Sequence, residues 1–169
     1  ADGLPTGELK GPEVMTPVGP FVGFERNLLD ADEAGLRNFA KLCVRTGTTT
    51  ITDLASRMDE DTVDMMLRVT SEPHYPIRLM PFRFFLGLSA PELVETVLAM
   101  KKRATDRLRL GQIKIVVDGS IQGFSARLRW PGYHNGAPNG LWYIAPEHLS
   151  ELLHLALEAG VQVHTHTNG

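Results

Sequence analysis

The sequence has a single cysteine, Cys43, among 169 residues. One thiol cannot build an internal disulfide, a four-cysteine zinc site or an iron–sulfur cluster, and it suits a reducing, cytoplasmic compartment. An excess of basic charge is also lacking, because 17 Lys and Arg stand against 20 Asp and Glu, for a net charge of −3. This balance argues against nucleic acid as a partner. No apolar run approaches the roughly 18–20 residues that cross a bilayer, so we expect no membrane segment.

Several catalytic motifs are missing as well. The sequence contains no Gly-rich phosphate-binding loop, no dinucleotide-binding glycine pattern after a strand and no Gly-x-Ser-x-Gly turn. It also starts without Met or a signal peptide and stops at Gly169, directly after a His-rich stretch. We therefore expect this chain to be a fragment of a longer protein.

What is present is one pattern, a helix followed by a strand, repeated four times. Residues 1–29 are rich in Gly and Pro and predict an irregular arm. The remainder, 30–169, alternates amphipathic stretches with short apolar or β-branched stretches near 48–54, 77–86, 112–117 and 161–166. Strands separated by helices pair in parallel, which predicts an α/β fold of four consecutive units. Such a chain suits either a small open sheet or a partial TIM barrel, since a complete barrel needs about 200 residues or more.

Local signals set the helix ends and the buried faces. Asp30 or Asp32 is expected to cap the first helix, and Gly47 to end it. Ser89 and Glu92, three residues apart, predict a capping box at the third helix. By helical spacing, the side chains expected to face the core are Leu36, Phe39, Ala40 and Cys43 in the first helix and Leu149, Leu152, Leu153 and Ala156 in the last.

Two histidines on the fourth strand are candidate metal ligands. In parallel α/β folds the active site lies at the C-terminal ends of the strands, where His164 and His166 stand. Residues two apart point to one face of a strand, and neutral imidazoles suit zinc. Two ligands do not make a catalytic zinc site, which usually has three. The alternative is one hydrogen-bonded histidine and one near the surface.

Lys114 stands in the otherwise apolar strand Ile113–Val117. A buried ammonium is energetically costly, so it needs a carboxylate partner or must lose its charge. A neutral amine can take up CO2 to become a carbamate, an anionic oxygen ligand. The alternative is an ordinary lysine paired with Asp118 or Asp53.

The connection over 119–145 is too long to be a simple turn, and ordered loops of this length are commonly functional. It contains both tryptophans of the chain and two of its three tyrosines, which argues against disorder. Such aromatics near strand ends make good pocket walls. The alternative is that they pack the loop onto its own scaffold.

Three segments, in this order, resemble the amidohydrolase superfamily, in particular its Amidohydrolase 3 branch of metal-dependent hydrolases. Relatives in that branch include proteins similar to exoenzyme regulatory proteins and to N-substituted formamide deformylases. The segments are Asp2-Gly3-Leu4-Pro5-Thr6-Gly7, Thr46–Asp53, and Ile113 to Ser120 followed by the aromatic loop, Gly140-Leu141, a helix and Val161–Gly169. The resemblance implies strands two to five of the family barrel.

By that resemblance, Lys114 is the carbamylated lysine of the fourth barrel strand, which bridges two metal ions, and His166 is the histidine ligand of the fifth strand. His164 lies where relatives vary, so we assign it only a supporting place behind the ligands. His164 and His166 could instead be aligned with the His-x-His of the family's first strand. We reject this alignment, because four α/β units precede these histidines and the Lys114 segment would then match nothing in the family. The first-strand His-x-His, the sixth-strand histidine and the eighth-strand aspartate of the family have no counterpart in the sequence.

The resemblance implies a hydrolase of amide-type, non-peptide C–N bonds that uses a divalent metal, with zinc expected, in the intact parent. Its small-molecule substrate is expected to contact Asp118, Arg127, Trp130 and Tyr133. With few ligands present, the isolated chain is expected to lack bound metal and to be inactive. The rival interpretation is a non-catalytic regulatory or interaction module, which forms homo-oligomers through open sheet edges.

Overall fold

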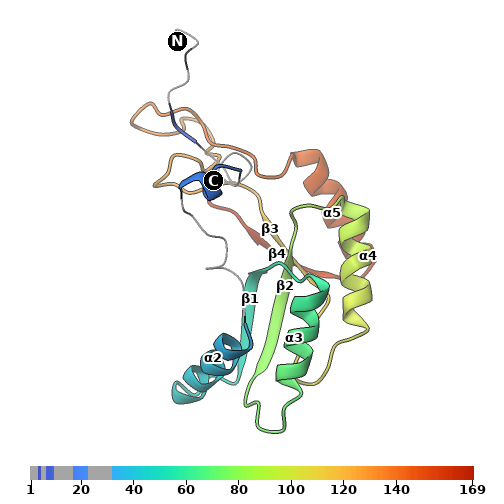
Figure 1. Ribbon diagram of the computed structural model, residues 1–169. Coiled ribbons are helices and arrows are strands. Elements are labelled where there is room, and N and C mark those ends of the chain that lie inside the picture. Colours follow the sequence, from blue (N-terminus) through green and yellow to red (C-terminus); the bar gives the residue numbers. More distant parts are fainter. Residues whose placement is uncertain (1–3, 5–6, 10–16, 23–31) are drawn as a thin grey trace. The chain divides into compact units, whose positions relative to one another are not determined.

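The computed structural model describes residues 4, 7–9, 17–22 and 32–169 (Figure 1). The predicted arm over 1–29 and the motif that begins at Asp2 therefore lie mostly outside the described residues, as does Asp30. Within the described part of the arm, a 3-10 helix, η1, spans Gly19–Val22. No helix of the described residues is long and apolar enough to cross a membrane.

The chain divides into two compact units. One comprises Ala31–Val116 and Ala145–His166 and carries the sheet. The other comprises Ala1–Asp30, Val117–Ile144 and Thr167–Gly169, and thus includes the long connection predicted to be functional. We call them the sheet unit and the loop unit.

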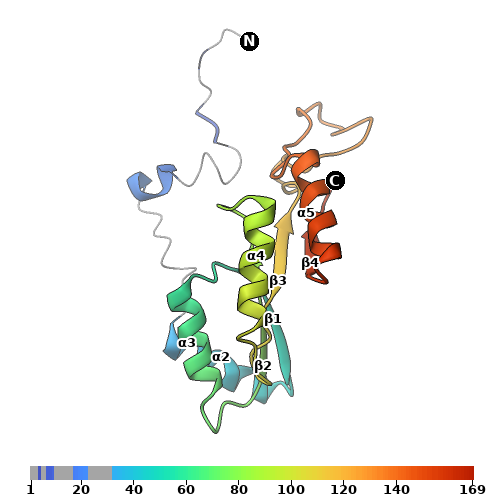
Figure 2. The same ribbon diagram turned by 90° about the vertical axis from the view of Figure 1, so that its right-hand side faces the viewer.

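The sheet unit confirms the predicted α/β fold. Its helices and strands alternate along the chain, and all neighbouring strands pair in parallel in the order β1-β2-β3-β4 (Figures 1 and 2). This arrangement is that of a partial TIM barrel. The elements are α2 (Glu33–Arg45), β1 (Thr50–Ser56), α3 (Glu60–Thr70), β2 (Arg78–Phe84), α4 (Ala90–Lys101), β3 (Gln112–Val116), α5 (Pro146–Glu158) and β4 (Gln162–His166).

Short polar side chains begin the helices as the sequence predicts. The Asp32 carboxylate accepts a hydrogen bond from the amide of Gly35 at the start of α2. At α4, the carboxylate of Glu92 accepts from the amide of Ser89 at 2.9 Å and from its hydroxyl at 2.6 Å, which confirms the capping box. Gly47, just beyond α2, has a φ of +73°, a left-handed conformation that glycine adopts at little cost.

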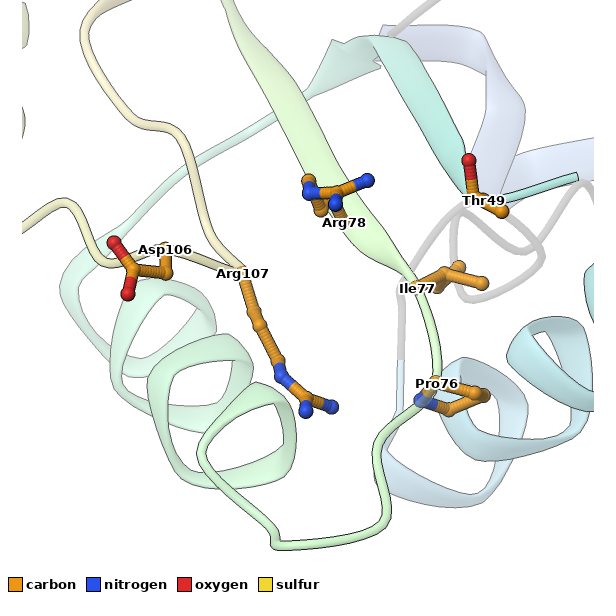
Figure 3. A pocket seen from close by; sticks show the side chains of 6 residues that line it. All are labelled: Thr49, Pro76, Ile77, Arg78, Asp106 and Arg107. Atoms are coloured by element: carbon orange, nitrogen blue, oxygen red, sulfur yellow. The ribbon is translucent and has the colours of Figure 1, made fainter.

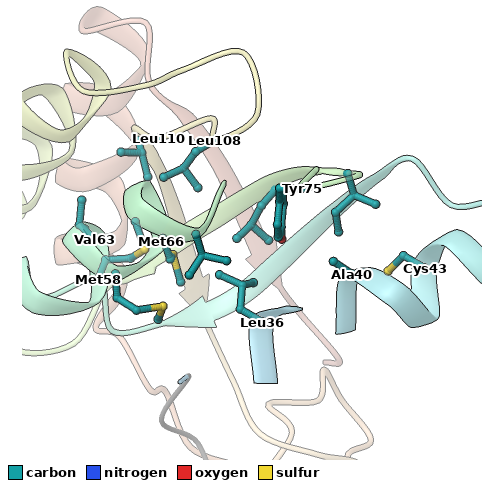
Figure 4. Close-up of a cluster of buried hydrophobic side chains, with 13 residues drawn as sticks. Leu36, Ala40, Cys43, Met58, Val63, Met66, Tyr75, Leu108 and Leu110 are labelled. Carbon is teal, nitrogen blue, oxygen red and sulfur yellow. The ribbon is translucent and has the colours of Figure 1, made fainter. Parts of the chain in front are cut away.

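The helices bury their apolar faces on one side of the sheet. Figure 4 shows part of this core, where side chains of α2 and α3 lie near the buried ring of Tyr75. Leu79 of β2 belongs to the same cluster. Further along the sheet, α4 packs against β3 and α5. Two predicted core residues are wrong, since Phe39 of α2 and Leu153 of α5 are exposed. The other buried members of the cluster are Leu36, Ala40, Cys43, Met58, Val63, Met65, Met66, Val69, Ile77, Leu108 and Leu110.

Register separates the sheet into two faces. Ile113 and Ile115 of β3 are fully buried. Because neighbouring parallel strands pair residue to residue and side chains alternate, Lys114 shares the other face with Phe84 of β2 and His164 of β4. The apolar run of β3 is thus interrupted by a lysine on one face only.

Candidate functional site

Three of the predicted site residues lie on one face of the sheet unit, on two adjacent strands. Lys114 of β3 is in register with His164 of β4, and Val116 is in register with His166. Lys114 and Val116 are two residues apart, as are His164 and His166, so all four side chains leave the sheet on the same side. This face therefore presents one amine and two imidazoles.

Lys114 is a buried amine, with only 7% of its surface exposed. Its Nζ lies 3.0 Å from Nδ1 of His164, across the β3–β4 pair. Burial lowers the pKa of this lysine, because the charged ammonium is poorly solvated there. Among the described residues the amine has no carboxylate in ion-pairing range, so the paired lysine that the sequence left open, with Asp118 or Asp53, is not formed. Burial thus shifts the amine of Lys114 toward its neutral form relative to an exposed lysine.

His164 is held from two directions. Besides the amine of Lys114, its ring meets that of Phe82 edge to face, with centroids 6.1 Å apart. Phe82 is buried on β2. Both histidines are exposed, and His166 stands at the last position of β4.

These residues fit part of a metal site. A carbamate oxygen on Lys114 and the imidazole of His166 would be two ligands from neighbouring strands, and the lowered pKa of Lys114 suits the amine that such a carbamate requires. The described residues contain no group of three His, Cys, Asp or Glu placed to hold a metal ion. Since catalytic zinc usually has three protein ligands, these two residues alone would not complete such a site.

In the loop unit, Asp118 is a buried carboxylate that ties two segments together. It is 2% exposed and comes two residues after β3. One oxygen accepts a hydrogen bond from the amide of Asn168 at 2.8 Å; the other accepts from the amides of Arg127 at 2.8 Å and Gly169 at 2.7 Å. The side chain of Asn168 donates in turn to the carbonyl of Gly119. We call this arrangement the Asp118 clamp.

Close backbone approaches shape the same loop. A side chain at Gly140 would place its Cβ 2.1 Å from the carbonyl oxygen of Ala126. At Gly119 a Cβ would lie 2.1 Å from Oγ of Ser125. Only glycine permits such contacts, so the glycines after Asp118 and before Leu141 serve packing within the loop.

The aromatic residues predicted to form a pocket wall differ in how far they are buried. Tyr133 is half-buried, and its hydroxyl donates to the carbonyl of Ala126 at 2.9 Å. The guanidinium of Arg127 lies 5.5 Å from the centroid of the Trp142 ring, within cation–π range. Trp130 is 94% exposed, so it takes no part in packing the loop onto its scaffold.

Some residues of these sites were missed at the sequence level. Phe124 packs edge to face on Tyr133, with centroids 5.3 Å apart, and has a φ of +51°, which is uncommon for a residue with a side chain. No signal in the sequence indicates that conformation. Phe82 could have been predicted from the sequence. It lies two residues before Phe84, the residue of β2 that pairs with Lys114, so both phenylalanines share the face of Lys114. The role of Asn168 could not have been predicted, because its partners Asp118 and Gly119 lie about 50 residues earlier in the sequence.

Comparisons with known proteins complete this description. Two solved structures, both of metal-dependent hydrolases, share the fold. The one from Pyrococcus furiosus has a TM-score of 0.61 and 17% identity, over 81% of this chain and 28% of that one. The one from Pyrococcus horikoshii OT3 has a TM-score of 0.64 and 14% identity, over 98% and 34%. The chain thus spans about a third or less of the length of these structures.

No curated protein matches the sequence. The sequence profile of the amidohydrolase family, however, matches residues 1–169, the whole chain. This chain belongs to the amidohydrolase family.

Proposed function

We propose that the chain forms part of a metal-dependent hydrolase of amide-type, non-peptide C–N bonds, in which Lys114 and His166 bind the metal. The observation that carries this proposal is the placement of both residues on one face of adjacent parallel strands, with the amine buried. Membership of the amidohydrolase family supports it.

The role of Lys114 follows from its chemistry. The nitrogen of a neutral amine adds to the carbon of CO2 and loses a proton, which leaves a carbamate with two anionic oxygens. Burial keeps Lys114 closer to the neutral form than an exposed lysine. His164, 3.0 Å away, fixes the direction of the amine without being a ligand itself.

A divalent metal, zinc in our proposal, would lower the pKa of a bound water and polarise the substrate carbonyl. Lys114 and His166 would hold it, together with donors that the described residues do not include. In the loop unit, Arg127, Trp130 and Tyr133 would contact the substrate. Arg127 offers a guanidinium and Trp130 an exposed indole. Asp118, predicted from the sequence to contact the substrate, would act through the clamp by ordering this loop.

The carbamate can be observed directly. The chain, incubated with 13C-labelled bicarbonate and Zn2+, should give a carbamate 13C resonance that disappears in Lys114→Met. Lys101→Met, an exposed lysine at the end of α4, is the matched control and should keep the signal. A resonance that survives Lys114→Met would contradict the proposal.

We propose further that residues 1–169 alone do not catalyse hydrolysis, because two ligands bind a metal only weakly. A panel of N-formyl and N-acyl amides, assayed with and without Zn2+, should show no turnover above buffer. Metal-dependent turnover that is lost in Lys114→Met would contradict the proposed inactivity of the chain but support the proposed metal site.

We also place the protein in the cytoplasm, which the buried, unbridged thiol of Cys43 suits.

A second candidate function is a non-catalytic module that self-associates. The observation that favours it is the sheet order, which leaves β1 and β4 as edge strands of the sheet unit, with most of β4 exposed. Metal-free chain that sediments as a stable dimer would favour this function. A monomer that binds metal would favour the hydrolase.

A further inference from the structure

We propose that a pocket at the N-terminal ends of β1 and β2 binds an oxyanion, namely the phosphate or carboxylate group of a small molecule. The pocket lies wholly within the sheet unit and has a volume of about 370 Å³, near the lower end of the range for ligand pockets. Active sites of parallel barrels lie at the opposite, C-terminal ends of the strands, so this inference does not rest on the proposed hydrolase. Its lining is formed by Thr49, Pro76, Ile77, Arg78, Asp106 and Arg107 (Figure 3).

Backbone hydrogen bonds hold the three lining segments against one another. The amide of Arg78 donates to the carbonyl of Thr49 at 2.9 Å, which joins the start of β2 to the residue before β1. The amide of Leu79 donates to the carbonyl of Arg107 at 2.8 Å, and the amide of Arg109 donates to the carbonyl of Leu79 at 2.9 Å. The positions that carry the two arginines are therefore fixed relative to each other, as a preformed site requires.

The two pocket arginines have unused donors. Arg78 donates one hydrogen bond, from its guanidinium to Oγ1 of Thr50 at 3.3 Å. Within the described residues, neither Arg78 nor Arg107 forms an ion pair. Three other arginines differ, because they pair with carboxylates: Arg37 with Glu33 and Glu72, Arg68 with Glu33, and Arg103 with Glu60 and Asp64.

The charge of the lining favours an oxyanion. Two guanidiniums and the carboxylate of Asp106 leave the lining with a net positive charge, which a monoanion would neutralise. Figure 3 shows the side chains of Asp106 and Arg107 extending in different directions from neighbouring positions, so the carboxylate does not cover the guanidinium. A planar guanidinium binds carboxylate and phosphate oxygens through two parallel hydrogen bonds.

The test is a titration of the chain with sodium phosphate, followed by the NMR signals of the backbone and of the arginine Nε–H groups at constant ionic strength. We expect saturable shifts at Thr49, Arg78 and Arg107. Arg78→Gln and Arg107→Gln should each weaken binding about tenfold, as expected for the loss of a charge-assisted contact. Asp106→Asn should tighten it. A parallel titration with sodium acetate then separates a phosphate site from a carboxylate site.

The matched control is Arg129→Gln, which removes the same charge from an exposed loop arginine. It should leave the phosphate affinity unchanged. Because all of these arginines are exposed, the variants should keep the amide spectrum of the folded chain. Shifts that grow without saturation, or an equal loss of affinity in Arg129→Gln, would overturn the proposal. So would unchanged binding in both pocket variants.

Discussion

Tyr75 is a polar side chain placed in the apolar core between α2, α3 and β2. It is 3% exposed, and within the described part of the chain its hydroxyl has no hydrogen-bond partner (Figure 4). Burial raises its pKa to about 12, with a further contribution from Cys43. The hydroxyl therefore adds nothing to stability at neutral pH, and its ring fills space.

The raised pKa of Tyr75 predicts alkaline unfolding. Above pH 10 the unfolded chain loses the phenolic proton while the folded chain keeps it, so stability falls as the pH rises from about 10 to 12. The loss due to this residue should reach roughly 2 kcal/mol near pH 12. Denaturant unfolding of the chain and of Tyr75→Phe, followed across this range, measures it by difference.

Tyr75→Phe should be as stable as the original chain or more stable at pH 7, because it removes an unpaired buried hydroxyl. Tyr143→Phe, in the loop unit, controls for the general titration of tyrosine. An equal alkaline loss in the original chain and in Tyr75→Phe would show that the phenol is not buried as described.

For Lys114 we expect the cost in stability at low rather than at high pH. In buffer free of CO2, Lys114→Met should stabilise the chain by about 1 kcal/mol at pH 7, because methionine fills a similar volume without a buried amine. Between the lowered pKa of this lysine and the ordinary value of 10.5, the folded chain binds fewer protons than the unfolded chain. The gain should therefore be smallest above pH 10.5, grow as the pH falls through this window and level off below it, which unfolding curves at several pH values will show. A gain that stays constant across this window would contradict the burial of a titrating amine.

At the scale of elements, the Asp118 clamp connects the start of the long loop to residues that follow β4. Asp118→Asn keeps the size of the side chain, but an amide nitrogen cannot accept the hydrogen bonds that a carboxylate oxygen accepts. We expect a loss of about 1 kcal/mol in stability, since a buried side chain loses at least one hydrogen bond to a partly buried amide. Hydrogen exchange should quicken at the amides of Arg127, Asn168 and Gly169.

A different role for Asp118 would give a different result. If its carboxylate served only as a substrate contact, those three amides would exchange as slowly in Asp118→Asn as in the original chain. Asp53→Asn is a suitable control, because among the described residues its carboxylate accepts only a local hydrogen bond, from the amide of Ala55.

The helices and strands could be predicted because their signals are local. The Ser89–Glu92 pair and the Asp32 cap act within one turn, and helices between strands leave parallel pairing as the natural arrangement. The exposure of Phe39 could not be predicted. The spacing of apolar residues gives the direction of the buried helix face, but not how wide a part of that face the neighbouring elements cover.

The candidate site was only partly predictable for the same reason. Alternation indicated that His164 and His166 share a face, but the contact of His164 with Lys114 depends on the register of two strands 50 residues apart. The clamp likewise depends on a partner distant in sequence. In both cases the residue type pointed to chemistry, and the partner emerged only from the folded sheet or loop.

At the scale of the whole molecule, the chain is about a third or less as long as the solved structures that share its fold. The sheet unit nevertheless holds an apolar core and an ion pair between two of its helices, Arg68 of α3 with Glu33 of α2. The face with Lys114 and His166 is built from this unit alone. Its ability to bind metal can therefore be tested on the chain itself.

The most direct test is a double-mutant cycle on zinc affinity in bicarbonate buffer, with Lys114→Met, His166→Ala and the two combined. If both side chains bind one ion, each single variant should weaken binding about tenfold or more, and the double variant should be little worse than either, with a coupling of about 1 kcal/mol or more. His154→Ala on α5, where the ring lies 3.3 Å from Glu158, is the control for a surface zinc site. Additive losses, or a loss confined to His154→Ala, would contradict a shared metal site on this face.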